Sequence, residues 1–68
     1  MEPFDQLYDQ LTEACEFDPE DRTANEETLY RFIDIVSAAS TKSEALARLR
    51  EYDIDMIETF ICIKAYLA

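Results

Sequence analysis

Histidine and glycine are both absent from this 68-residue chain, and the two absences exclude much of ordinary enzyme chemistry. Without histidine there is no Ser–His or Cys–His nucleophile, and without glycine there is no phosphate-binding loop or oxyanion turn of the usual kind. Two neighbouring carboxylates, Asp53 and Asp55, are interpreted as a helix cap and a solvated neighbour rather than as an acid–base pair. The sequence therefore predicts no catalytic residues and a protein that is not an enzyme.

Cysteine is scarce, with Cys15 and Cys62 alone, and tryptophan is missing altogether. Each cysteine stands among apolar neighbours in a helical pattern, which is typical of a buried free thiol. We therefore expect a reduced protein of the cytoplasm, with a disulfide between the two cysteines as the alternative. The cysteines are not at metal-ligand spacing, so we expect no metal and no cofactor.

Long apolar runs are lacking as well. The run from Phe60 to Ile63 ends at Lys64, and the first three residues do not form the basic stretch that begins a secretory signal. We expect neither such a signal nor contact with a membrane. A chain of this length is predicted to form a single domain, residues 1–68, which buries only about 60% of its unfolded surface. Such a core supplies no more than about 3–5 kcal/mol of stability.

The apolar residues of the first half of the chain recur at helical spacing. Positions i, i+3, i+4 and i+7 predict a helix over residues 3–16, and Pro19 interrupts the pattern soon after. A second helix is predicted over residues 25–39. Thr23 is expected to cap this helix, and Glu26 is expected to reach back and close a capping box.

Two more helices are expected in the second half of the chain. Thr41 and Glu44 form another capping box ahead of a short amphipathic helix. Asp53 is predicted to cap a last helix, which runs from Ile54 to the C-terminus and is apolar around most of its circumference. The expected fold is all-α, a small bundle of three to four short helices.

Positive charge is absent from the first 21 residues, which contain eight Asp and Glu residues and no Lys or Arg. The rest of the chain is close to neutral, so most of the net charge of −10 belongs to the first predicted helix and the loop after it. Acidic residues line one face of that helix and continue into the loop. We call these residues the acidic row: Asp5, Asp9, Glu13, Glu16, Glu20 and Asp21.

Stability does not explain the acidic row, because like charges at helical spacing destabilise a helix by about 0.2–0.5 kcal/mol per pair. One interpretation is a solvated face that improves solubility. The other is a binding surface, because complementary charge speeds encounter and selects basic partners. We predict that the row binds a basic partner protein, specifically a nucleic-acid-binding protein or complex whose nucleic-acid site it occupies.

Direct binding of nucleic acid is not expected. Residues 41–60 have the outline of a helix-turn-helix, whose second helix would have to enter the major groove between phosphates. That second helix carries Asp53, Asp55 and Glu58 at its candidate exposed positions. Phosphates would repel this surface, so ordinary helix packing is the preferred explanation of the pattern.

In small size, acidity and lack of catalytic residues, the chain resembles phage-encoded DNA mimics and anti-CRISPR inhibitors. The resemblance implies an inhibitor that acts in the host cytoplasm by occupying a nucleic-acid-binding site. It is carried by general character and by no motif of a single family, so it transfers no residue roles. An immunity protein or antitoxin that neutralises a basic toxin remains open as an alternative.

The last predicted helix suggests a different class of function. It carries two apolar stripes, which exceed what one small core needs. One stripe is predicted to pack inside and the other to join a second copy, which would give a homodimeric adaptor or structural subunit. The alternative is that the whole helix fills the centre of the bundle. The residues predicted for the oligomer interface are Met56, Phe60, Ile63 and Leu67.

Overall fold

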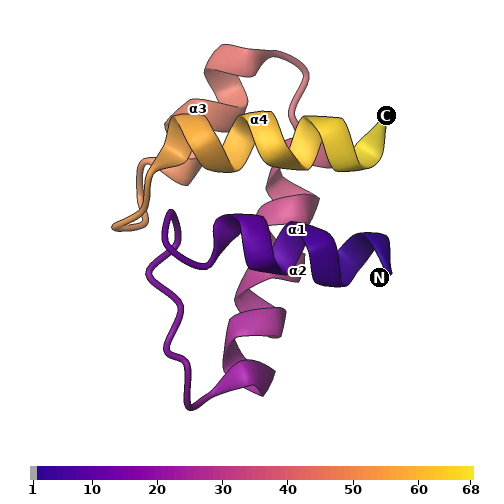
Figure 1. The fold of residues 1–68 in the computed structure, drawn as a ribbon. Helices are drawn as coiled ribbons and strands as arrows, with labels where there is room; N and C mark the ends of the chain where they lie inside the picture. The colour runs from indigo at the N-terminus through magenta and orange to yellow at the C-terminus, as the bar shows by residue number, and fades with distance from the viewer. Residues whose placement is uncertain (1) are drawn as a thin grey trace.

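The computed structural model describes residues 2–68 and consists of four helices joined by loops and turns. The helices are α1 (Pro3–Leu11), α2 (Arg22–Ala38), α3 (Lys42–Leu49) and α4 (Met56–Leu67). α1 and α4 lie side by side and run in opposite directions, so the start of α1 and the end of α4 are at the same end of the molecule (Figure 1). α2 crosses behind this pair, and α3 packs against α2 and α4. The predicted all-α bundle is confirmed.

One apolar core holds the four helices together. Leucine-sized side chains dominate it, and burying each of them contributes about 1.5–3 kcal/mol. Two polar side chains, Asn25 and Thr59, are buried with the core, and both are hydrogen-bonded. The buried apolar residues are Leu7, Tyr8, Leu11, Cys15, Phe17, Leu29, Phe32, Val36, Ala45, Leu49 and Ile63.

α1 ends earlier than the sequence predicted, at Leu11 instead of residue 16. The Thr12 hydroxyl donates a hydrogen bond to the Tyr8 carbonyl at 2.9 Å, and the Thr12 N–H lies 3.5 Å from the Asp9 carbonyl. A threonine hydroxyl that bonds the carbonyl four residues back competes with the helical backbone. The apolar spacing could not reveal this competition, because the core residue Cys15 keeps its helical position in the turn that follows.

The turn after α1 closes with a left-handed residue. The Phe17 N–H bonds the Thr12 carbonyl at 3.0 Å, and the Glu16 N–H bonds the Glu13 carbonyl at 3.2 Å. This pair of bonds is a Schellman motif, which needs a left-handed residue and usually places glycine there. In this glycine-free chain the position is occupied by Glu16, with φ of 51°.

The helix caps also differ from the prediction at two of three sites. α2 is capped by Asp21 instead of Thr23, and α4 is capped by Asp55 instead of Asp53. Aspartate ranks above threonine as a cap, so residue type favours Asp21 over Thr23, but it cannot distinguish Asp53 from Asp55. The Thr41 cap of α3 is confirmed, with its hydroxyl 3.1 Å from the Glu44 N–H. No helix within residues 2–68 is both long and apolar enough to cross a membrane.

Candidate functional site

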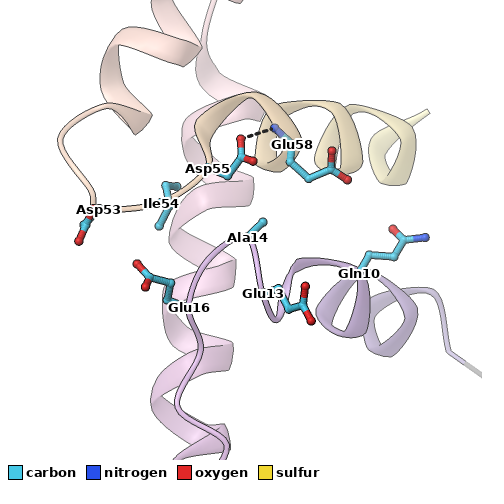
Figure 2. Close-up of a pocket in the computed structure, with 8 residues that line it drawn as sticks. All are labelled: Gln10, Glu13, Ala14, Glu16, Asp53, Ile54, Asp55 and Glu58. Carbon is cyan, nitrogen blue, oxygen red and sulfur yellow. Dashed lines mark hydrogen bonds between the residues drawn. The ribbon is translucent and has the colours of Figure 1, made fainter.

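An open cleft of about 560 Å³ lies where the turn after α1 meets the first turn of α4 (Figure 2). Its lining combines two segments that are about forty residues apart in the sequence. Most of the lining side chains are carboxylates, and the remaining ones are Gln10, Ala14 and Ile54. We call this site the acidic cleft; its five carboxylates belong to Glu13, Glu16, Asp53, Asp55 and Glu58.

The two walls of the acidic cleft are joined by hydrogen bonds. The Asp55 N–H donates to the Ala14 carbonyl at 2.8 Å, which ties the start of α4 to the turn after α1. Just beneath, the Cys15 thiol lies 3.4 Å from the Thr59 hydroxyl, and both side chains are buried. The Asp55 carboxylate also accepts a bond from the Glu58 N–H at 3.1 Å as the cap of α4 (Figure 2). These hydrogen bonds fix the backbone segments that carry the carboxylates.

Backbone strain is found on one wall of the acidic cleft. Glu16 has the left-handed conformation described above, which costs a residue with a Cβ atom about 1–2 kcal/mol relative to its favoured geometry. The conformation persists because the Schellman bonds and the buried neighbours Cys15 and Phe17 fix it. Its consequence is that the Glu16 carboxylate stands in the cleft rather than on the α1 surface (Figure 2).

The charges of the acidic cleft are not balanced by nearby cations. Within residues 2–68, both ion pairs involve Arg22, whose partners are Asp5 at 2.9 Å and Glu26 at 3.0 Å. All five cleft carboxylates belong to exposed residues. Two unit charges 4 Å apart in water repel by about 1 kcal/mol, and a concave surface focuses the field of several like charges. The cleft is therefore a centre of negative potential.

The two cysteines are free thiols whose side chains bond Thr59 and Glu58 of α4, and both have raised pKa values. Burial raises the pKa of the Cys15 thiol above its ordinary value of 9.0; the Thr59 hydrogen bond lowers it in part, and the charge of Asp55 raises it further. Partial burial raises the pKa of the Cys62 thiol, as do its 3.4 Å hydrogen bond to Glu58 and the Glu58 charge. The thiolate is the reactive form, so both residues are poor nucleophiles at neutral pH.

The members of the predicted acidic row have different surroundings in the structure. Asp5 is paired with Arg22, and Asp21 caps α2 by accepting from the Ala24 N–H at 3.2 Å. Asp9 and Glu20 are exposed and lie outside the cleft lining. Because α1 ends at Leu11, the row bends there, and only its members Glu13 and Glu16 reach the acidic cleft.

Sequence reasoning missed the second wall of the acidic cleft. Asp53, Asp55 and Glu58 were interpreted as a cap, a solvated neighbour and a deterrent to DNA, and not as a site. Antiparallel packing of the first and last helices brings them beside Glu13 and Glu16 (Figure 2). The available signal was the position of the two groups, one after the first predicted helix and the other at the start of the last.

The residues predicted for an oligomer interface lie mostly inside this chain. Ile63 is fully buried, Met56 and Phe60 pack against the core, and Leu67 is 44% exposed. The exposed apolar stripe of α4 is instead the second one, which contains Ile57, 55% exposed, and Ile61, 53% exposed. The burial of the two stripes is the reverse of the prediction. The apolar pattern left out Thr59, which is buried on the same face of α4 as Ile63.

The acidic cleft does not have the form of a metal site. Among the residues that the structure describes, no three Cys, Asp or Glu side chains are grouped so that they could hold a metal ion. The labelled carboxylates point in different directions around the opening instead of converging (Figure 2). What the arrangement offers chemically is several charge-assisted hydrogen-bond acceptors on a rigid, concave surface.

Neither a protein-family model nor a curated protein nor a solved structure matches this chain.

Proposed function

We propose that this protein is a non-catalytic inhibitor that presents the acidic cleft to a basic, nucleic-acid-binding site on a partner protein. The observation that carries the proposal is the gathering of five carboxylates from two distant segments, with no Lys or Arg of residues 2–68 in ion-pair reach of them. A surface of this kind attracts basic proteins and repels nucleic acid.

The target is a nucleic-acid site because such sites concentrate Lys and Arg that have no carboxylate partners of their own. A duplex presents one charge per roughly 1.7 Å of its axis, and the proteins that bind it line their grooves with cations accordingly. Carboxylates on a fixed backbone can bind those cations. Here the backbone is fixed by the hydrogen bond from the Asp55 N–H to the Ala14 carbonyl. A nucleic acid would then be excluded by competition for the same side chains.

The cost of the acidic cleft also supports a binding role. Clustered like charges lower stability, and the left-handed Glu16 adds about 1 kcal/mol or more of strain. A core of this size supplies only about 3–5 kcal/mol in total. Strained residues in small proteins gather at functional sites, where the geometry serves recognition rather than stability.

The test is a charge reversal in the acidic cleft with a matched control on α2. We expect Glu13→Lys with Asp53→Lys to abolish capture of basic proteins from the native host's lysate, and Glu27→Lys with Asp34→Lys, two exposed acids of α2, to leave it intact. The captured protein should lose its affinity for labelled DNA or RNA as the wild-type inhibitor is added. Equal capture by both variants, or no competition with nucleic acid, would contradict the proposal.

A homodimeric adaptor is the second candidate, and the exposure of Ile57 and Ile61 on α4 favours it. A sedimentation mass near twice 7.9 kDa that persists in high salt and is lost in Ile61→Ser would support this function. A monomer at micromolar concentration would remove its basis.

A further inference from the structure

The acidic cleft continues into a neutral hollow along the seam between α1 and α4. This second hollow has a volume of about 240 Å³, and none of its lining residues is charged. Leu7 and Gln10 line it from α1, and Cys62, Ala65 and Tyr66 line it from α4. Gln10 lines the acidic cleft as well, so the two hollows are neighbours along the seam between α1 and α4. We call the two hollows together the α1–α4 groove.

An exposed apolar strip on α4 meets this groove at Ala65, the one member of the strip that lines either hollow. Ile57, Ile61 and Ala65 are exposed and spaced four residues apart, so they share one face of α4. The same helix supplies Glu58 to the acidic cleft and Ala65 to the neutral hollow. The lining of the groove therefore changes from acidic near the start of α4 to uncharged near its end.

We propose that the α1–α4 groove binds a basic amphipathic helix of the partner protein. The Lys and Arg side chains of that helix lie over the acidic cleft, and its apolar side chains lie over Ile61, Ala65 and Tyr66. This inference rests on the proposed function and specifies the part of the partner that is bound. Helices that lay an apolar face into a groove between two other helices are a recurring mode of recognition.

The dimensions of the groove favour a helix over other occupants. α1 and α4 have 9 and 12 residues, so at 1.5 Å per residue the groove is roughly 14–18 Å long and matches about three helical turns. An extended peptide that binds by strand addition would need a sheet edge to pair with, and residues 2–68 contain no strand. A nucleic acid would leave the exposed side chains of Ile57 and Ile61 unburied and would be repelled by the cleft.

The two halves of the groove should contribute to binding in different ways. Contacts with the acidic cleft accelerate association and weaken as salt is added. Contacts with the apolar half slow dissociation and are insensitive to salt, because burial of apolar surface does not depend on screening. The inference therefore predicts a salt-resistant part of the affinity, which charge attraction alone does not give.

The experiment titrates the isotope-labelled full chain with two synthetic peptides while the backbone amides are followed by NMR. One probe is a Leu/Lys peptide of about 14 residues ordered to form an amphipathic helix, and the other has the same composition in an order with no apolar face. We expect the amphipathic probe to shift amides along the whole groove and to keep measurable affinity at about 0.5 M NaCl. The second probe should shift only the acidic cleft and be released by salt. Identical footprints and salt responses, or a footprint on another face, would overturn the inference.

Two variants separate this inference from the proposed function. Ile61→Ser should weaken the amphipathic probe about tenfold and leave the other probe unchanged, whereas Leu67→Ser, an exposed residue that does not line the groove, should change neither. Glu13→Gln with Glu58→Gln should weaken both probes. If only Ile61→Ser is without effect, the helix-in-groove inference fails and the proposed function stands. If the Gln variant also binds both probes normally, both fail.

A second copy of this chain is the competing occupant of the apolar strip. Sedimentation of the unliganded protein distinguishes the two occupants, since the inference expects a monomer whose apolar strip is free to bind a partner. A dimer of the wild type that becomes a monomer in Ile61→Ser would show that the strip joins two copies, and it would overturn the proposal.

Discussion

The acidic residues at the two ends of the N-terminal acidic segment have different charged neighbours in the structure. At the start of α1, Asp5 is paired with Arg22, whose guanidinium also bonds Glu26 and lies 4.3 Å from the centre of the Tyr8 ring. Beyond α1, Glu13 and Glu16 meet three further carboxylates and no cation. The negative charge at the start of α1 is therefore balanced within the chain, whereas the negative charge beyond α1 is free to attract a cationic partner.

The contrast teaches that net charge alone does not locate a binding surface. The eight acids of the first 21 residues are equivalent in composition, yet the structure uses some for pairing and capping. Those that remain are joined by acids from a part of the chain whose charge is nearly balanced. Substitutions in the loop after α1, among the acidic residues at both ends and at Cys15 beneath the acidic cleft test this comparison.

The largest effect is expected at Asn25, which fastens the loop after the acidic turn to Tyr8 of α1. Its side-chain amide donates to the Tyr8 hydroxyl at 2.9 Å and to the Asp18 carbonyl at 2.6 Å, and its oxygen accepts from the Asp18 N–H at 3.3 Å. Asn25→Leu leaves these buried or partly buried groups without partners, which should lower the free energy of unfolding by about 2–3 kcal/mol. Urea denaturation measures this, and the exposed Glu27→Ala is the control. A loss as small as that of the control would show that the loop does not depend on Asn25.

The next effect concerns the strain at Glu16, and it has the opposite sign. Glu16→Gly removes the penalty of a left-handed residue with a Cβ atom and should raise the free energy of unfolding by about 1 kcal/mol. Glu16→Gln removes the charge and keeps the strain, so it should stabilise less. Equal stabilisation by the two variants, measured by thermal unfolding, would mean that charge rather than backbone geometry dominates at this position.

Neutralising one acid at each end should move stability in opposite directions. Asp5→Asn breaks the pair with Arg22 and should lower Tm, while Glu13→Gln relieves repulsion in the acidic cleft and should raise the free energy of unfolding by about 0.2–0.5 kcal/mol. Added NaCl should shrink both differences, because it screens exposed charges. Shifts of the same sign at low salt would remove the distinction between the ends.

The smallest effect is expected beneath the cleft, at alkaline pH. The pKa of the Cys15 thiol is raised in the folded protein, mainly by burial, so the unfolded chain releases this proton first as pH rises. The resulting stability is fully present below the ordinary pKa of 9.0 and is lost as pH rises through the folded value. Urea denaturation between pH 7 and about 10.5 should show the stability gap between wild type and Cys15→Ala narrowing above pH 9. A constant gap would mean that Cys15 titrates alike in both states.

The all-α fold was predictable from sequence, and the helix ends were not. The apolar spacing that predicted four segments reports which side chains enter the core, and the core residues of α1, α2 and α4 keep that spacing. The ends depend on local hydrogen bonds. Thr12 bonding back to Tyr8 shortened α1, and the choice of Asp55 over Asp53 as cap depended on the backbone bond from Asp55 to Ala14.

The candidate site was predictable only in part, for a reason of topology. Glu13 and Glu16 were identified because they belong to one segment in which acidic residues recur at helical spacing without any Lys or Arg. Asp53, Asp55 and Glu58 belong to a segment whose own charge is unremarkable, and only the antiparallel contact of α1 and α4 places them opposite. The outward face of α4 was misjudged for a similar reason, since burial of the hydroxyl of Thr59 depends on its partner Cys15.

The start of α1 and the end of α4 lie together, at the opposite end of the seam from the acidic cleft (Figure 1). A fluorophore, an affinity handle or a carrier domain joined there would lie away from the carboxylates of the acidic cleft. Because neighbouring chain ends also suit insertion into a loop of another protein, the four helices could be transplanted as a unit that displays its charged opening outward.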